Sequence, residues 1–275
     1  MFSIVIPLYN KEISITKTLK SVINQTFQNF EIVLVNDGST DNSLRVVKAI
    51  DDSRIRVIDK PNGGVSSARN RGVKEAKNEW VTFLDADDLW KPNHLETIYN
   101  MIMKFPQESV FCTSFIRSNQ TLPTQQNNTI SIIENYFEEA IKYHFFWTSV
   151  TCIHNKVFKD VGYFLENFSR GEDLELWERI GRQGFKFIKS NLVTAVYNVD
   201  TENKITKSKY NYKNSSLLTI HNRNRFFKSK QEKKYFIKIA YNSVITFLSK
   251  FDAINCFRSS YRLLYLWFKP VNKGK

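Results

Sequence analysis

The sequence predicts an α/β fold in which helices cover both faces of a mostly parallel sheet, followed by a small helical region at the C-terminus. Strand-like and helix-like segments alternate through the first 115 residues, and the strand-like segments are almost continuously apolar. Such runs are typical of parallel strands that are buried on both faces. A third observation is that a strongly basic stretch, with helical apolar spacing, begins near residue 201.

Four apolar runs in the first part of the chain are expected to be strands: Phe2–Ile6, Glu31–Val35, Ile55–Ile58 and Trp80–Leu84. Helices are expected between them, over residues 13–26, around Leu44–Ile50 and from the Asn62-Gly63-Gly64 turn to about Ala76. Further along, we expect helices over residues 131–143 and Glu172–Gln183, and closing strands at Phe185–Ile188 and Val193–Val199.

Composition and charge divide the chain into two regions. Residues 201–275 contain 17 Lys and Arg and 3 Asp and Glu, whereas the other 200 residues contain 23 basic and 24 acidic side chains. The three dispersed cysteines predict neither a disulfide framework nor a zinc site. No signal peptide and no apolar stretch of about 18 residues is visible, so we expect a cytoplasmic protein or one on the inner face of the cytoplasmic membrane.

A polar cluster follows each of the four predicted strands. Ligands of parallel sheets bind beyond the carboxyl ends of the strands, so these four loops should meet at one edge. The clusters are Pro7-Leu8-Tyr9-Asn10, Asn36-Asp37-Gly38-Ser39, Asn62-Gly63-Gly64 and Asp85-Ala86-Asp87-Asp88.

Asp85-Ala86-Asp87 is the strongest single feature. Two carboxylates would repel an anionic sugar-nucleotide diphosphate unless a divalent cation, Mn²⁺ or Mg²⁺, bound both. The alternative is that Asp87 or Asp88 caps the helix that is expected to begin at Pro92.

The other loops offer contacts for a nucleotide. Asp37 can accept a hydrogen bond from a base imide or from ribose, and Tyr9 can stack on a base. The glycine-rich turn at Asn62-Gly63-Gly64 allows close backbone approach and opens a helix that carries Arg69, which could face phosphate. For Asp37 and Arg69 the alternatives are a local turn and a solvated side chain.

Glu172 and Asp173 open a predicted helix. A carboxylate there can act as the general base that inverting sugar transfer needs. A stabilising interaction with the helix dipole is the alternative.

Together these motifs, with Ser66-Ser67-Ala68-Arg69-Asn70 and Gly171-Glu172-Asp173, closely resemble family 2 glycosyltransferases of the GT-A (Rossmann-like) fold over residues 2–199. Gly162-Tyr163-Phe164-Leu165-Glu166 resembles a further motif of the family, with Leu165 where Asp is usual. The resemblance implies a metal-dependent hexosyl or N-acetylhexosaminyl transferase. The implied reaction is inverting transfer from a UDP-sugar to a glycan or lipid-linked oligosaccharide in bacterial surface polysaccharide synthesis.

The resemblance also implies a role for each matching residue. Asp37 would hold uracil with Tyr9 near the base, Asp85 would contact ribose, Asp87 would bind the metal ion, and Asp173 would be the base with Glu172 beside it. The donor nucleotide site would comprise Pro7, Tyr9, Asn10, Asp37, Asn62, Gly63, Gly64, Arg69, Asp85 and Ala86. Residues 1–205 would form the GT-A unit and residues 206–275 the basic helical region.

The basic C-terminal region leaves alternatives open. Residues 232–250 and 252–269 each place apolar side chains along one helical face, with Lys and Arg between them. Such helices suit an anionic membrane surface, but they could equally pack on the first unit or on a second copy of the chain. We expect no nucleic-acid partner, because no nucleic-acid-binding module is present.

Two other functions are disfavoured. A nucleotidyltransferase would carry a basic glycine-rich loop after the first strand, where this chain has Pro7-Leu8-Tyr9-Asn10. A sugar-nucleotide-binding scaffold would not need the full carboxylate set.

Overall fold

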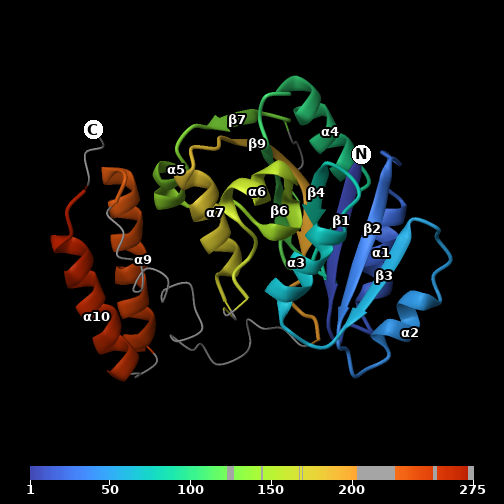
Figure 1. The fold of residues 1–275 in the computed structure, drawn as a ribbon, viewed down its shortest axis with the longest axis horizontal. Coiled ribbons are helices and arrows are strands. Elements are labelled where there is room, and N and C mark those ends of the chain that lie inside the picture. Colours follow the sequence, from blue (N-terminus) through green and yellow to red (C-terminus); the bar gives the residue numbers. More distant parts are fainter. Residues whose placement is uncertain are drawn as a thin grey trace.

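The computed structural model describes residues 1–122, 127–143, 145–166, 168, 170–202, 227–249 and 253–271. Residues 206–226, which open the expected basic region, lie outside this description. Figure 1 shows helices on both faces of a central sheet and two long helices at one end of the molecule. This arrangement confirms the expected α/β fold with a C-terminal helical region.

The strands are β1 (Phe2–Leu8), β2 (Phe30–Asp37), β3 (Ile55–Lys60), β4 (Trp80–Phe83), β5 (Leu89–Trp90), β6 (Val110–Arg117), β7 (Ile130–Ile133), β8 (Thr151–His154) and β9 (Phe187–Tyr197). The helices are α1 (Ile15–Ile23), α2 (Ser43–Lys48), α3 (Val65–Glu75), α4 (His94–Lys104), α5 (Tyr136–Lys142), α6 (Lys156–Val161), α7 (Glu172–Arg182), α9 (Lys230–Ser249) and α10 (Ala253–Phe268), with a 3-10 turn at Thr148–Val150.

The first half of the sheet is parallel, as the alternation of strands and helices predicts. Strands β3, β2, β1 and β4 are neighbours in that order and all run the same way. Parallel neighbours cannot be joined by a tight turn, so α1, α2 and α3 cross between them and cover the sheet. The side chains of β1 and β2 are almost all buried. The carboxyl ends of these four strands therefore share one edge.

The second half makes the sheet mixed. Strand β8 is antiparallel to both β4 and β6, and β6 is parallel to β9. It follows that β9 runs in the same direction as β1, while β8 runs in the opposite direction. The end of β9 and the start of β8 therefore lie at the same edge as the ends of β1, β2 and β4. The two expected closing strands are the single strand β9.

The expected helix over residues 131–143 is wrong in its first part. Residues up to Ile133 form β7, which pairs antiparallel with β9, and α5 begins only at Tyr136. Asn135 separates the two elements, because its side chain accepts hydrogen bonds from the N–H groups of Phe137 and Glu138 and caps the helix. The spacing of apolar residues could not locate this cap.

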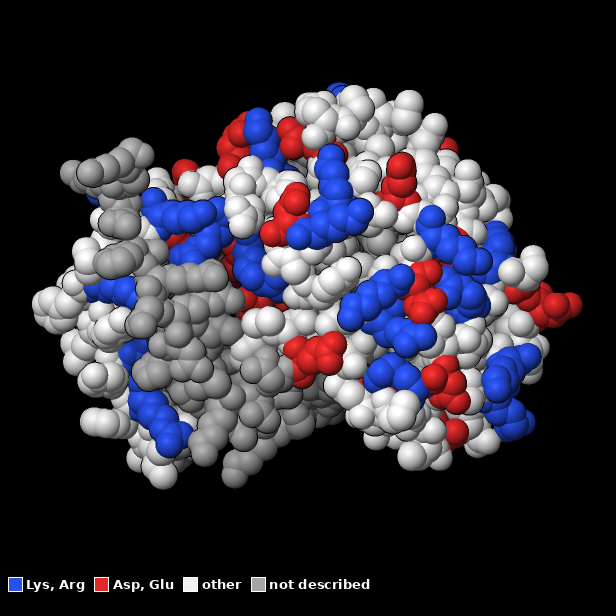
Figure 2. All heavy atoms as spheres, viewed as in Figure 1, with Lys and Arg blue, Asp and Glu red and all other residues white. Residues whose placement is uncertain are grey.

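Charges are mixed over the surface of the sheet unit. On the face shown in Figure 2, Lys and Arg are interspersed with Asp and Glu over this part of the molecule. This pattern agrees with the near balance of basic and acidic residues in the first 200 positions.

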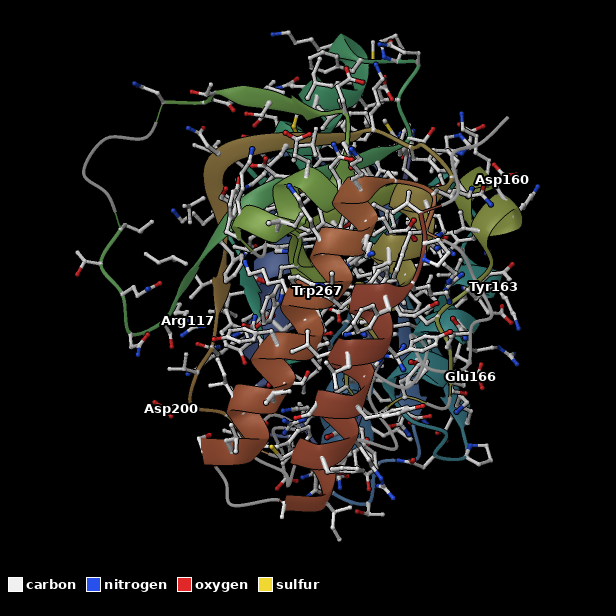
Figure 3. The ribbon with its side chains drawn as sticks, turned by 90° about the vertical axis from the view of Figure 1, so that its left-hand side faces the viewer. Arg117, Asp160, Tyr163, Glu166, Asp200 and Trp267 are labelled. Atoms are coloured by element: carbon white, nitrogen blue, oxygen red, sulfur yellow. The ribbon has the colours of Figure 1, made fainter. Side chains whose placement is uncertain are left out.

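Helices α9 and α10 form a hairpin, called here the C-terminal hairpin, and lie side by side in Figure 3. Helix α9 packs on α5, with the Phe137 ring 5.5 Å from that of Tyr235 and 6.0 Å from that of Phe236. A buried ion pair joins Arg182, at the end of α7, to Glu232 of α9. The hairpin thus shares its core with the sheet unit. Among the described helices, none has the length and apolarity needed to cross a bilayer.

Helix α3 approaches the sheet closely at Gly72. A Cβ atom at this position would lie 2.3 Å from Cγ1 of Val5 in β1, which is closer than real side chains come. The absence of a side chain at Gly72 therefore sets how deeply α3, the helix that carries Arg69, packs on the sheet.

We predict that Gly72→Ala lowers the free energy of unfolding by about 1–3 kcal/mol, because the added methyl group overfills this contact. Adding Val5→Ala should recover part of the loss, and Lys74→Ala on the exposed side of α3 should change it by no more than about 0.5 kcal/mol. Urea denaturation gives the free energy of unfolding of the native protein and of the three variants. Equal stability of Gly72→Ala and the native protein would contradict the close approach.

Candidate active site

The loops after β1 and β2 are tied together by Asn10. Its backbone has a φ of 50°, a left-handed conformation that Asn tolerates better than most residues. Its side-chain oxygen accepts a hydrogen bond from the N–H of Thr40 at 2.8 Å, and its own N–H donates to Ser39 Oγ at 3.1 Å. Tyr9 is 44% exposed beside this junction, and Pro7 lies half-buried within β1. Asn10 thus fixes the loop that presents the Tyr9 ring.

Asp37, the last residue of β2, anchors the glycine turn. Its carboxylate accepts hydrogen bonds from the N–H groups of Gly63 at 3.0 Å and Gly64 at 2.7 Å, and it pairs with Lys60. The turn packs so tightly that a Cβ on Gly38 would lie 2.7 Å from the backbone nitrogen of Asn62. The side chain of Asp37 is nearly buried, but carboxylate oxygens have further lone pairs for a base or ribose.

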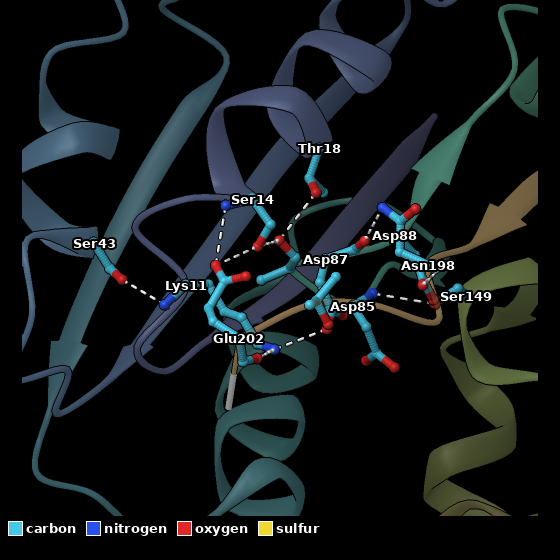
Figure 4. Close-up of polar contacts among 12 residues, drawn as sticks. Lys11, Ser14, Thr18, Ser43, Asp85, Asp87, Asp88, Ser149, Asn198 and Glu202 are labelled. Atoms are coloured by element: carbon cyan, nitrogen blue, oxygen red, sulfur yellow. Dashed lines mark hydrogen bonds and ion pairs between the residues drawn. The ribbon is translucent and has the colours of Figure 1, made fainter. Parts of the chain in front are cut away.

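The segment from Asp85 to Asp88 follows β4 and is held from both sides (Figure 4). The carbonyl of Ala86 accepts a hydrogen bond from Thr18 Oγ1 of α1 at 2.9 Å. Asp88 accepts one from Ser149 Oγ at 2.7 Å and one from the N–H of Asn198 at 3.2 Å. The alternative of a helix cap is wrong, because α4 begins at His94, six residues beyond Asp88.

Asp88 is the buried support of this segment. Burial, followed by the negative charges of Asp85 and Asp87, raises the pKa of Asp88 well above its usual value. With its side chain directed to Ser149 and Asn198, Asp88 serves to hold the segment, while Asp85 pairs with Arg69 and Asp87 pairs with Lys11.

Asp87 already has a cationic partner. The ammonium group of Lys11 lies 2.8 Å from Asp87 Oδ2, and both side chains are nearly buried. Thr201 Oγ1 donates to the same oxygen at 2.6 Å. Lys11 also contacts the backbone oxygen of Glu202, whose carboxylate accepts from Ser14 Oγ at 2.8 Å. The segment after β9 is thereby fastened over Asp87.

Arg69 lies between two acidic groups that are far apart in the sequence. Its guanidinium donates to Asp85 Oδ1 at 2.7 Å and to Glu172 Oε1 at 2.8 Å, and the residue is 3% exposed. Burial opposes its charged form, but the charges of Asp85 and Glu172 outweigh that effect and raise the pKa of Arg69. This side chain, predicted to face phosphate, instead joins the segment after β4 to the start of α7.

Glu172 and Asp173 occupy the first turn of α7, after Gly171 in a left-handed conformation with φ of 73°. Burial, followed by the charge of Asp173, raises the pKa of Glu172, although Arg69 opposes this. Asp173 is less buried, and its carboxylate accepts hydrogen bonds from Thr148 Oγ1 at 3.3 Å and from the N–H of Leu174 at 2.8 Å. Asp173 is thus the more accessible of the two carboxylates.

Asp87 could hold a divalent cation only together with a ligand that supplies further oxygens. In the described part of the chain, no three His, Cys, Asp or Glu side chains gather around one point. Mg²⁺ commonly needs only one or two protein carboxylates, because substrate phosphates supply further oxygens. The ammonium of Lys11 beside Asp87 indicates that this carboxylate favours a positive charge.

Several contacts at this edge were not identified from the sequence. They come from the first loop (Lys11), from the 3-10 turn before β8 (Ser149) and from the segment after β9 (Asn198, Thr201 and Glu202). The direction of β9 would have indicated the last group, because β9 ends at the same edge of the sheet as β4.

Comparison with known proteins identifies the family. The model of glycosyl transferase family 2 matches residues 3–162, more than half of the chain. The chain therefore belongs to glycosyl transferase family 2. This membership leaves no support for the nucleotidyltransferase alternative.

Curated relatives are longer than this chain. Glycosyltransferase GlyG of Streptococcus pneumoniae is 40% identical over 107 residues, which are 38% of this chain and 36% of GlyG. The minor teichoic acid biosynthesis protein GgaB of Bacillus subtilis is 32% identical over 231 residues, 80% of this chain and 26% of GgaB. The chain thus spans about a third or less of either relative's length.

Solved structures agree on the fold. S. aureus TarS in complex with UDP-GlcNAc matches with a TM-score of 0.70 and 21% identity, over 86% of this chain and 70% of that chain. Mannosyltransferase PcManGT from Pyrobaculum calidifontis, in complex with GDP-Man and Mn²⁺, matches with a TM-score of 0.57 and 18% identity, over 74% of this chain and 58% of that chain. The fold is therefore GT-A-like.

We predict that Arg69→Met lowers the free energy of unfolding by about 3–5 kcal/mol, because it leaves two acidic groups without their shared cation. Adding Glu172→Gln should recover part of this loss, because it removes one of the two carboxylates that have lost their cationic partner. Chemical denaturation is the measurement, and Arg71→Met, on the exposed side of the same helix, is the control, with an expected loss of about 1 kcal/mol or less. A loss of stability as small as that of Arg71→Met would contradict the ion pairs of Arg69 with Asp85 and Glu172.

Proposed function

We propose that the protein is an inverting, metal-dependent glycosyltransferase. It would move a hexosyl or N-acetylhexosaminyl group from a UDP-sugar to a hydroxyl of a glycan or lipid-linked oligosaccharide, in the assembly of bacterial surface polysaccharide. Family membership and the relatives GlyG and GgaB support this assignment. The UDP-GlcNAc bound by TarS supports a UDP-sugar as the donor.

One observation carries the proposal. A single guanidinium, that of Arg69, contacts both Asp85 beside β4 and Glu172 at the start of α7. Asp87 lies two positions after Asp85 and Asp173 directly follows Glu172, which supports the proposal that the donor carboxylates and the base belong to one site. A transferase needs this proximity, because the base must reach the acceptor hydroxyl while the donor is held.

We propose that the donor lies across the edge of the sheet. Tyr9 would stack on the base, Asp37 would accept from the uracil imide, and Asp85 would contact ribose. The other proposed nucleotide contacts are Pro7, Asn10, Asn62, Gly63, Gly64, Arg69 and Ala86. Among these, Asn10 and Arg69 would act by fixing the loops, because their polar atoms already contact protein.

Asp173 is the proposed general base. The acceptor oxygen would form a bond with the anomeric carbon of the sugar while its proton passes to the Asp173 carboxylate. The bond between that carbon and the diphosphate oxygen would break on the opposite side, so the configuration inverts and UDP leaves. Glu172, already paired with Arg69, would position Asp173 and the acceptor. The greater accessibility of Asp173 supports this division of roles.

We propose that Asp87 binds Mn²⁺ or Mg²⁺. When bound, the ion neutralises charge on the departing diphosphate. The Mn²⁺ in PcManGT supports a divalent ion in a protein of similar fold. Lys11 would leave Asp87 when the ion binds, and its ammonium could then contact the diphosphate.

The proposed division of the chain follows from these roles. Residues 1–205 would bind the donor and catalyse transfer, because all the proposed donor and base residues precede β9 or lie at this edge. Residues 206–275 would form the basic helical region, held to the first unit by α9. The proposed location is the cytoplasm or the inner face of the cytoplasmic membrane. Self-association remains a proposal that the basic region could support.

We predict that Asp173→Asn lowers the rate of transfer by about 10²–10⁴-fold, because the acceptor proton has no base. The affinity for UDP should stay within about twofold, since Asp173 does not hold the nucleotide. Transfer is followed by mass spectrometry with a panel of UDP-sugars and extracted lipid-linked glycans, and UDP binding by calorimetry. Asp160→Asn, an exposed carboxylate on α6, is the matched control. Near-normal transfer by Asp173→Asn would contradict the assignment, and UDP binding without turnover by the native protein would favour a scaffold.

We predict that Lys11→Met tightens Mn²⁺ binding by about tenfold, because a charged hydrogen-bond partner no longer competes for Asp87. Asp87→Asn should weaken Mn²⁺ binding by at least a similar factor. Electron paramagnetic resonance of free Mn²⁺, without nucleotide, measures both, and Lys17→Met on the exposed side of α1 is the control. Unchanged Mn²⁺ affinity in Asp87→Asn would rule out the proposed ligand.

A further inference from the structure

Helix α10 is amphipathic, but it packs on the protein with the less apolar of its two sides. The buried positions Ser259, Arg262 and Leu266 follow each other at intervals of three and four residues, and α10 packs on α9. The opposite side is apolar and between 45% and 79% exposed. We call it the outer face of α10, and it comprises Ile254, Phe257, Tyr261, Leu264, Tyr265 and Phe268. A helix of a water-soluble domain ordinarily buries such an apolar stripe. An exposed apolar face of this kind therefore indicates a surface that binds a partner.

Helix α9 packs on the protein with apolar residues. Tyr235, Phe236, Ala240 and Phe247 are buried, whereas Tyr241, Ile245 and Leu248 are exposed. Packing on the first unit, one of the possibilities that the sequence leaves open, therefore accounts for the buried side of α9. It does not account for the outer face of α10.

The basic side chains near the outer face of α10 favour an anionic partner. Between residues 230 and 271 the chain has eight Lys and Arg and two acidic residues, Glu232 and Asp252, and Glu232 is paired with Arg182. Exposed Arg258 follows Phe257 within the face, and the Lys269 ammonium lies 5.2 Å from the Tyr265 ring at its end. Blue Lys and Arg side chains are visible along the hairpin in Figure 2. Aromatic and aliphatic side chains framed by basic ones match the headgroup region of an anionic bilayer.

A second copy of the chain fits this surface less well. Two outer faces placed together would bring Arg258 and Lys269 of each copy close to those of the other, with two acidic residues per hairpin, of which Glu232 is already paired with Arg182. An anionic lipid surface supplies the opposite charge and an apolar layer at the same time.

We propose that the outer face of α10 lies on an anionic lipid surface. Its 16 residues span about 24 Å, which is shorter than the roughly 30 Å hydrocarbon layer, so the helix would lie along the interface. The rings of Phe257 and Phe268 enter the boundary of the acyl chains, while Arg258 and Lys269 contact lipid phosphates.

The C-terminal hairpin also connects the proposed lipid-binding surface to the candidate active site. Helix α9 is fastened to α7 by the buried Arg182–Glu232 ion pair. Helix α7 begins with Glu172 and Asp173, so α10 is joined to the candidate active site through α9 and α7. Lipid binding itself does not depend on the transfer reaction and holds for any acceptor.

Co-sedimentation of the full-length protein with vesicles tests the proposal. We expect binding to vesicles of phosphatidylcholine and phosphatidylglycerol at 7:3, weaker binding at high salt, and little binding to phosphatidylcholine alone. The double variant Phe257→Ser/Phe268→Ser should bind at least about tenfold more weakly. The double variant Met103→Ser/Ile132→Ser removes two exposed apolar side chains elsewhere and should bind as the native protein does. Circular dichroism checks that both variants fold.

Fluorescence gives a second readout. Trp267 in α10 is 62% exposed, whereas Trp147 is half-buried and Trp80, Trp90 and Trp177 are buried. Brominated lipids should therefore quench the native protein, and Trp267→Phe should remove most of that quenching. Absence of binding to the anionic vesicles, equal binding by the two double variants, or quenching that survives Trp267→Phe would each overturn the proposal. A further result would also overturn the proposal. The native protein would bind no lipid, and sedimentation would show a dimer that is lost in Phe257→Ser/Phe268→Ser but kept in Met103→Ser/Ile132→Ser.

Discussion

The buried guanidinium of Arg69 is the interaction on which the candidate site depends. It joins a carboxylate at the end of β4 to one at the start of α7, two segments that no sheet hydrogen bond connects. Buried ion pairs often add little net stability, because removing charges from water offsets their attraction. In this protein the ion pairs fix the geometry of the site, because the planar guanidinium of Arg69 holds both carboxylates in place at once. Gly72 supports this arrangement by letting α3 pack directly on β1.

The same principle extends along the edge of the sheet. Each of the three proposed donor carboxylates has a basic partner from another segment, so that Lys60 accompanies Asp37, Arg69 accompanies Asp85 and Lys11 accompanies Asp87. These cations keep a cluster of acidic groups from repelling one another in the absence of ligand. A nucleotide diphosphate with its metal ion carries both signs of charge, and could exchange partners with these pairs without leaving a buried charge unmatched.

The arrangement of the first 90 residues follows from local patterns, whereas the order and direction of the later strands do not. Strands that end in polar turns predicted the convergence of Tyr9, Asp37 and Asp85, because the ends of parallel strands must meet. Nothing local indicated that β8 runs antiparallel between β4 and β6, which brings Ser149 and the segment after β9 to the same edge. The motif around Arg69 was recognised, but its two partners lie 16 and 103 residues away and only tertiary packing reveals them. Periodicity likewise predicted α9 and α10 but not that α10 turns its apolar side outward.

A crystal structure of the protein with UDP and Mn²⁺ tests the central claim most directly. The account predicts a cation between Asp87 and the diphosphate, the uracil ring beside Tyr9 and Asp37, and Lys11 moved away from Asp87. It also predicts that Arg69 still joins Asp85 to Glu172, with Asp173 open to the side where an acceptor would enter. UDP bound away from the ends of β1, β2 and β4, or Arg69 contacting neither acidic group, would contradict the account.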